Sequence, residues 1–209
     1  MPTLYCCIGL LAAGLSMFLL GRAIGFGYSS SQMNPDVVLV YTKKLKRHGR
    51  IPDSGKISVL AGYHESKRLN IPLVLYGGIT RSLYPAEALV YESFLRSTVE
   101  IDEMKLIVKP VGKDTQSVLE NALLFFEATK YTSVLHVANA GHLWRIKATC
   151  QRLKRRNYGK TLQHAFMSSG IGDMQVFLMD VLFWNILEPI VPNWLRCLFQ
   201  KLQRGGTSD

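Results

Sequence analysis

The sequence predicts an α/β fold in which helices cover both faces of an open, mainly parallel β-sheet. From residue 36 onward, short runs rich in β-branched and other apolar residues alternate with segments of helical periodicity. The chain has 209 residues and is 48% hydrophobic, which is enough for one domain with a buried core. Glycines and polar residues follow several of the apolar runs, as expected where strands turn into loops.

The expected strands and helices alternate along the chain. The apolar runs predict strands at residues 36–41, 71–76, 105–109, 133–138 and 162–167. The helical patterns predict helices near residues 54–69, after Pro85, from 115 to 130, and after Asn139. Pro85 suits the first position of a helix, where its missing N–H costs nothing. Asp114 and Thr115 predict the cap of the third helix.

Five regions make up the expected domain organisation. They are an N-terminal membrane anchor (1–28), a polar linker (29–35), the α/β domain (36–170), apolar and amphipathic C-terminal helices (171–204) and a disordered tail (205–209). The stretch from Leu4 to Leu20 carries no charged residue and, with the apolar residues beyond Arg22, can span a bilayer. No Lys or Arg precedes it, so we expect a retained single-pass anchor rather than a cleaved signal peptide.

The charge distribution predicts an anionic partner. The net charge is +10, and eight Lys or Arg residues lie between Lys43 and Arg68. Eight more lie between Lys130 and Lys160, while no Asp or Glu occurs from residue 128 to 172. Such a surface attracts phosphate-bearing small molecules or anionic membrane lipids. The aromatic residues near the basic runs form no RNA-binding signature, so no nucleic acid is expected.

Candidate ligand-binding residues follow the fourth predicted strand, where open α/β sheets bind their ligands. His142 and Arg145 are three residues apart, so they share one face of the first turn of the next helix. The N–H groups at a helix start favour an anion there. A helix cap with a surface arginine is the alternative interpretation.

Two further strand ends carry polar candidates. Gly77 and Gly78 close the second strand, where glycines let a backbone approach a ligand closely, and Glu87 starts the following helix. Asp114 and Thr115 follow the third strand and fit a helix cap or a ligand contact. The cysteines show no metal-binding spacing, and we assign no metal. Histidines 48, 64, 136 and 164 are interpreted as surface or core residues, with His136 buried and hydrogen-bonded.

Over residues 36–157, these motifs resemble the YdcF/SanA/ElyC-like family of bacterial envelope-associated proteins. The resemblance rests on the apolar strand 37–40, Lys56 after Gly49, Tyr76-Gly77-Gly78, Glu87-Ala88, Asp114-Thr115 and His142-Leu143-Trp144-Arg145. The chain departs from the family pattern at Tyr41-Thr42, which replaces the glycine closing the first strand, at Lys56, which replaces an arginine, and at Tyr76, which replaces a serine.

The resemblance implies a Rossmann-like domain, usually extracytoplasmic behind one membrane anchor, that serves cell-envelope biogenesis. From it and the basic surface we expect binding, and hydrolysis if the protein is an enzyme, of a phosphate- or pyrophosphate-bearing envelope metabolite such as a polyprenyl-linked substrate. Gly77 and Gly78 would supply backbone donors, while Arg145 and Lys56 would neutralise phosphate oxygens. His142 would act as acid, base or donor, with Glu87 as its complement.

Two other function classes stay open at this point. The same strand ends could hold a nucleotide or an S-adenosylmethionine-type cofactor without catalysis, although no Gly-x-Gly-x-x-Gly follows the first strand. Alternatively, the anchor and the amphipathic C-terminal helix could make the protein an envelope scaffold. No cofactor is assigned from the sequence.

Overall fold

The computed structural model describes residues 34–102, 105–159 and 161–170. The predicted anchor, residues 29–33 of the predicted linker, the predicted C-terminal helices and the tail lie outside these ranges. Among the described residues, no helix combines the length and the apolar character needed to cross a membrane.

Five strands form one parallel sheet in the order β3-β2-β1-β4-β5. The strands are β1 (Val37–Tyr41), β2 (Leu73–Tyr76), β3 (Leu106–Lys109), β4 (Ser133–Ala138) and β5 (Gln163–Ser168). β1 lies at the centre, and its Val38 is paired with Leu73 of β2 and with Leu135 of β4. Every residue of β1, β2 and β4 is buried, which explains their continuous apolar runs.

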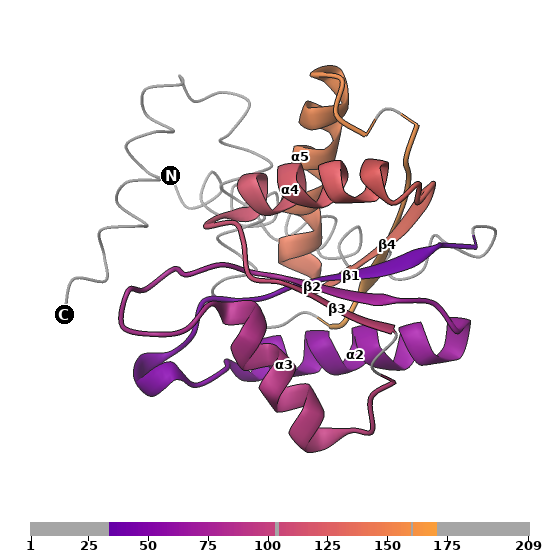
Figure 1. Ribbon diagram of the computed structural model, residues 1–209. Helices are drawn as coiled ribbons and strands as arrows, with labels where there is room; N and C mark the ends of the chain where they lie inside the picture. Colours follow the sequence, from indigo (N-terminus) through magenta and orange to yellow (C-terminus); the bar gives the residue numbers. More distant parts are fainter. Residues whose placement is uncertain (1–33, 103–104, 160, 171–209) are drawn as a thin grey trace, which may run out of the picture.

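Helices cover both faces of the sheet (Figure 1). Helices α2 (Asp53–Leu69) and α3 (Glu87–Thr98) lie on one face, and α4 (Thr115–Ala128) and α5 (Ala140–Arg155) lie on the other. A short 3-10 helix, η1 (Arg47–Gly49), precedes α2. Alternate residues of β1 serve the two layers: Leu39 and Tyr41 belong to the core under α4 and α5, and Val38 and Val40 to the core under α2 and α3.

The predicted α/β fold with helices on both faces is confirmed, and all of the strand pairs are parallel. β4 has the predicted bounds, and the other strands differ from the prediction by one or two residues. The predicted position of Pro85 was wrong, because α3 begins at Glu87 with Ala86 as its N-cap. The carbonyl groups of Gly78 and Gly77 accept the N–H groups of Glu87 and Ala88 at distances of 3.0 and 3.1 Å, and these bonds define the helix start.

Candidate functional site

The order of the strands reverses between β1 and β4. The chain leaves β1 for β2 over one face of the sheet, and it leaves β4 for β5 over the other face (Figure 1). The carboxyl ends of the two strands at such a switch point are the usual ligand site of an open α/β sheet. We use the term switch-point site for the side chains gathered at this edge: Tyr41, Thr42, Glu87, Thr115 and His142.

His142 is held on the first turn of α5. Its N–H donates to Oδ1 of Asn139, the N-cap residue, at 3.1 Å. Its ring packs edge-on against the ring of Tyr41 with centroids 5.5 Å apart, and its Nε2 lies 3.3 Å from Oγ1 of Thr115. Burial, together with the charges of Arg145 and Lys43, lowers the pKa of His142 well below its usual value. The imidazole is therefore neutral at neutral pH.

Glu87 is the first residue of α3 and only 5% exposed. The hydroxyl of Thr42 donates to its Oε2 at 3.2 Å, and the hydroxyl of Thr80 donates to its Oε1 at 2.5 Å. Burial raises the pKa of this carboxyl, and the hydrogen bonds from Thr80 and Thr42 and the charge of Lys44 act in the opposite direction. Glu87 is thus a buried carboxyl group with its two oxygens fixed.

The end of β1 lies between His142 and Glu87. Tyr41 belongs to the core under α4 and α5 and contacts His142, whereas the next residue, Thr42, contacts Glu87 at the start of α3. Neighbouring residues of a strand point to opposite faces, and this alternation continues through Thr42. The imidazole and the carboxyl group therefore flank the same strand end from the two faces of the sheet.

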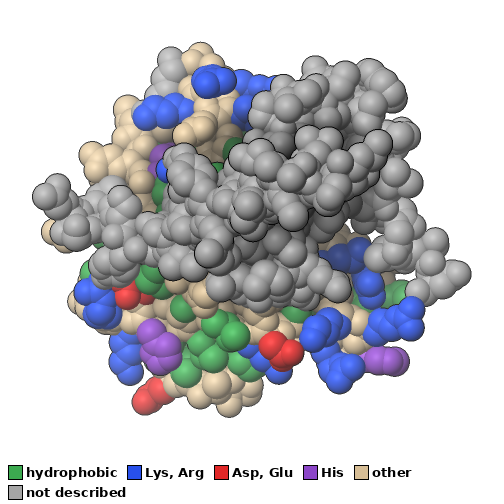
Figure 2. All heavy atoms as spheres, turned by 180° about the vertical axis from the view of Figure 1, so that it is seen from behind, with side chains coloured by type: hydrophobic (Ala, Val, Ile, Leu, Met, Phe, Trp, Pro, Cys, Tyr) green, Lys and Arg blue, Asp and Glu red, His purple; other side chains and the backbone are tan. Residues whose placement is uncertain are grey.

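Four cations surround the switch-point site, and we name Lys43, Lys44, Arg81 and Arg145 the basic rim. Lys43 and Arg145 are close enough to His142 for their charges to lower its pKa. The pKa of Lys44 is lowered by burial and by the charge of Arg81, and it is raised by Glu87, which places these three groups together. Lys and Arg also outnumber carboxylates on the surface seen from behind (Figure 2).

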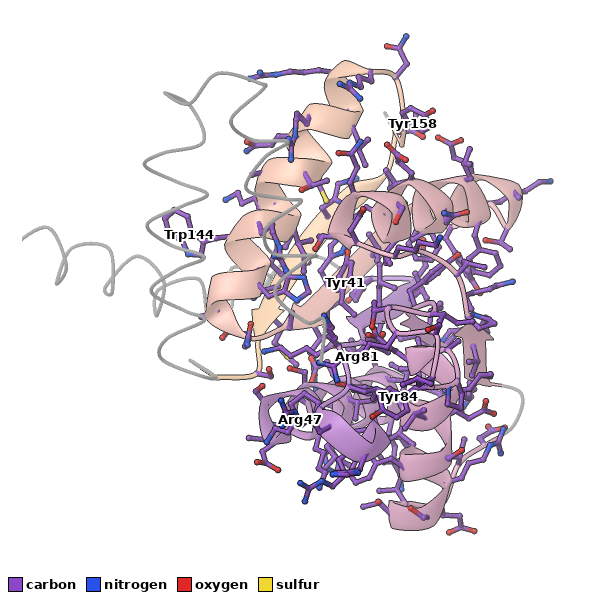
Figure 3. All side chains as sticks on the ribbon, turned by 90° about the vertical axis from the view of Figure 1, so that its left-hand side faces the viewer. Tyr41, Arg47, Arg81, Tyr84, Trp144 and Tyr158 are labelled. Atoms are coloured by element: carbon purple, nitrogen blue, oxygen red, sulfur yellow. The ribbon has the colours of Figure 1, made fainter. Side chains whose placement is uncertain are left out.

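Arg81 contributes a polar group that is suited to a ligand. It lies in the loop between β2 and α3, at the same edge of the sheet as Tyr41 (Figure 3). Its Nε is buried and has no hydrogen-bond partner among the described residues. A buried donor without a partner costs free energy, which an anion at this position would recover. Sequence reasoning missed Lys43, Lys44 and Arg81, although only Thr42 separates the two lysines from the buried strand β1.

Gly77 and Gly78 have a packing role in the structure. The N–H of Gly77 donates to the carbonyl of Lys109 at 3.2 Å, and the N–H of Gly78 donates to that of Gly112 at 2.8 Å. The predicted role of these N–H groups as ligand donors is wrong for this conformation, because both are already bonded within the protein. An added Cβ would collide with Thr42 at Gly77 and with the backbone of Gly112 at Gly78, so both positions require glycine.

Lys56 and Asp114 make structural contacts. Nζ of Lys56 lies 4.0 Å from a carboxylate oxygen of Asp53 and 5.7 Å from the ring centroid of Phe94. The cations that act on the pKa of His142 are Arg145 and Lys43, and the one that acts on the pKa of Glu87 is Lys44. The predicted phosphate contact of Lys56 stays a prediction. Asp114 is the predicted N-cap of α4: its Oδ1 accepts from the N–H of Ser117 at 2.9 Å.

A second polar cluster lies next to the switch-point site, and the spacing of its members in the sequence does not predict that they meet. Nε2 of His136 lies 2.9 Å from Nδ1 of His164, and Nδ1 of His136 lies 2.6 Å from the hydroxyl of Tyr41. The ligand atoms of His136, His164 and Cys150 all lie within 4.8 Å of one another. His136 is buried and hydrogen-bonded, as predicted. Parallel pairing of β4 with β5 explains why the two histidines meet. It sets Val134 opposite His164, and His136, two residues after Val134, points to the same face of the sheet.

A pocket of about 400 Å³ lies at the opposite edge of the sheet. Its lining includes Tyr63, Lys67, Glu100 and Lys105, from the carboxyl end of α2 and the approach to β3. Charges of both signs line it, so the pocket does not favour an anion in the way that the basic rim does.

The sequence matches no known protein-family model, and no curated protein matches it at a significant level. The resemblance to the YdcF/SanA/ElyC-like family therefore rests on short sequence motifs between residues 36 and 157.

Proposed function

We propose that this protein binds the phosphate or pyrophosphate group of a metabolite at the switch-point site and hydrolyses it. The observation that carries the proposal is the gathering of Lys43, Lys44, Arg81 and Arg145 around a neutral imidazole and a single buried carboxyl group. Cations gathered at one edge of a sheet create a positive potential that attracts an anion. The buried Nε of Arg81 would gain a hydrogen-bond acceptor at the same time.

In this proposal, His142 and Glu87 act from the two sides of the bound group. Phosphoryl transfer places the attacking and leaving oxygens in line, so the two groups that handle protons must lie on opposite sides. Neutral His142 accepts the proton of the attacking water as that oxygen bonds to phosphorus. Glu87, whose pKa is raised by burial, takes up a proton from solvent before the reaction and supplies it to the leaving oxygen as the bond of that oxygen to phosphorus breaks. The basic rim stabilises the negative charge of the transition state.

The resemblance to the YdcF/SanA/ElyC-like family supports a more specific version of this proposal. We infer that the substrate is an envelope metabolite, such as a lipid-linked pyrophosphate, and that residues 1–28 anchor the protein in a membrane with the α/β domain outside the cytoplasm. The apolar N-terminal stretch and the net charge of +10 support this version. We expect membrane lipids and no nucleic acid among the partners.

The test is ligand binding followed by turnover, with the purified full-length chain. Thermal denaturation is measured with inorganic phosphate, pyrophosphate, polyprenyl phosphates, sugar nucleotides and S-adenosylmethionine. A ligand at about a hundred times its Kd stabilises a protein by about 2.7 kcal/mol, which corresponds to a rise in Tm of roughly 5–10 °C for a domain of this size. Phosphate release is then measured for each compound that binds.

Three variants separate the roles. Arg145→Ala should weaken binding and reduce its dependence on salt, because one cation of the rim is lost. His142→Ala should abolish phosphate release while binding persists. Lys67→Gln, on the exposed carboxyl-terminal turn of α2, is the matched charge control and should change neither.

The other function classes predict different results. Stabilisation by S-adenosylmethionine alone would replace the proposal with a cofactor-binding function. A chain that none of these compounds stabilises would favour the scaffold. Full phosphate release by the His142→Ala variant would show that the catalytic assignment is wrong.

A further inference from the structure

We propose that His136, His164 and Cys150 form a zinc-binding site between the sheet and α5. His136 lies on β4, His164 lies on the edge strand β5, and Cys150 lies in the middle of α5. These three elements follow one another in the chain, and their packing brings the nitrogen and sulfur atoms of the three side chains within 4.8 Å of one another. Two imidazoles and one thiolate are a ligand set that suits zinc.

The distances require only a small adjustment to hold the ion. With Zn–N bonds of about 2.0–2.1 Å, two nitrogens of a tetrahedral site lie roughly 3.3 Å apart. The facing nitrogens of His136 and His164 are 2.9 Å apart, so they would separate by a few tenths of an ångström. A nitrogen and a sulfur of such a site lie roughly 3.6 Å apart, since the Zn–S bond is about 2.3 Å. The thiol group of Cys150 is within reach of that distance.

The protonation states favour a metal at this position. Burial and the charge of His164 lower the pKa of His136 well below its usual value, and burial lowers the pKa of His164 to about 4. Both rings are therefore neutral at neutral pH and have a lone pair to donate. Burial raises the pKa of the Cys150 thiol to about 12, but a bound zinc ion deprotonates a coordinating thiol. The thiolate would offset part of the charge of the ion.

Tyr41 supports the metal-binding orientation of His136. A histidine that binds a metal through one nitrogen usually donates the N–H of its other nitrogen to a neighbour, which fixes the ring. Nδ1 of His136 is 2.6 Å from the Tyr41 hydroxyl, so this nitrogen can carry the proton and leave Nε2 for the metal. Phe166 stacks on the same ring with centroids 5.0 Å apart, which further restricts its orientation.

An ion could reach this site from the edge of the sheet. His136 is fully buried and Cys150 is only 6% exposed, but His164 is partly exposed on β5, the outermost strand next to β4. Three protein ligands leave one tetrahedral position for water. The bound ion would join α5 to β4 and β5, and the first turn of α5 carries His142. This inference does not depend on phosphate binding and goes beyond the proposed function.

The test is binding of Zn²⁺ to the purified full-length chain in a reducing buffer, measured by competition with a chromophoric chelator. We expect one equivalent of zinc per chain and a higher Tm with the metal. Cys150→Ser and His164→Ala each remove one ligand and should weaken binding at least about 10-fold. His64→Ala, an exposed histidine on α2, is the matched control and should bind zinc like the wild type.

Cobalt gives a second readout that does not depend on affinity. Co²⁺ bound by a thiolate shows a sulfur-to-metal charge-transfer band in the near ultraviolet, which we expect in the wild type and not in Cys150→Ser. Circular dichroism of the variants without metal shows whether they fold. A wild type that binds no zinc would overturn the proposal. Stoichiometric zinc and an unchanged cobalt spectrum in folded Cys150→Ser would overturn it as well.

Discussion

The hydrogen bond between Thr42 and Glu87 allows the geometry of the switch-point site to be tested by stability alone. Thr42→Val keeps the shape of the side chain and removes the hydroxyl group that lies 3.2 Å from Oε2 of Glu87 and 3.0 Å from the carbonyl of Tyr76. A hydrogen bond to a charged group contributes about 1.5–3 kcal/mol. We therefore expect a loss of about 2 kcal/mol at neutral pH, or roughly 4–8 °C in Tm for a domain of this size.

The dependence of this loss on pH identifies the acceptor. Burial raises the pKa of Glu87, so the folded state binds a proton more tightly than the unfolded state, and this group favours folding more as the pH falls. Loss of the Thr42 hydroxyl raises the pKa further, because one bond to the carboxylate disappears. The difference in free energy of unfolding between the variant and the wild type should be largest at pH values above the folded-state pKa of Glu87. It should shrink toward pH of about 4, below the raised pKa of the folded state, where Glu87 is mainly protonated in both folded proteins.

Urea denaturation at pH of about 7.5 and at pH of about 4 measures the free energy of unfolding of the variant and of the wild type at each pH. Thr98→Val is the matched control: this exposed threonine also donates to a backbone carbonyl, and its replacement should change stability by no more than about 0.5 kcal/mol. An equal loss at both pH values would mean that Thr42 donates to Tyr76 instead of Glu87. No loss at either pH would refute the hydrogen-bond geometry described for β1.

Two further predictions concern packing, and thermal or urea denaturation checks both. Leu123 and Leu124 are neighbours on α4 but are 1% and 53% exposed, so Leu123→Ala should cost about 2–5 kcal/mol and Leu124→Ala at most about 0.5 kcal/mol; equal costs would contradict the orientation of the helix. Gly77→Ala would place a Cβ in collision with Oγ1 of Thr42 and 2.8 Å from Cβ of Thr42 and should cost about 1–3 kcal/mol; an unchanged Tm would show that this contact is not tight.

The sequence predicted those elements whose signal is local. β4 has its predicted bounds because its apolar run ends before Asn139, whose side chain caps the next helix. The Asp114 cap was predicted for the same reason, since capping is decided within one turn. The start of α3 was misplaced because distant carbonyl groups, those of Gly77 and Gly78, determine it.

The residues of the switch-point site are easier to recognise from the sequence than those of the proposed zinc site. His142 and Glu87 lie on the first turns of the helices that follow β4 and β2, so the rule that ligands bind at strand carboxyl ends identifies them. His136, Cys150 and His164 are 14 residues apart in each interval, which is not a metal-binding spacing. The pairing of β4 with β5 and the packing of α5 on the sheet bring them together. The buried Nε of Arg81 is likewise a property of the folded loop.

The central position of β1 has a consequence for how the protein folds. Asp36, at its start, is hydrogen-bonded to Ser133, which is 97 positions further along the chain. During synthesis, β1 can pair with β2 early, but its other edge stays open until β4 has been made. Open apolar edges pair with other chains, and pairings this distant form slowly. We therefore expect aggregation of nascent chains to begin at β1, and chaperones that cover apolar strands to raise the yield of folded protein.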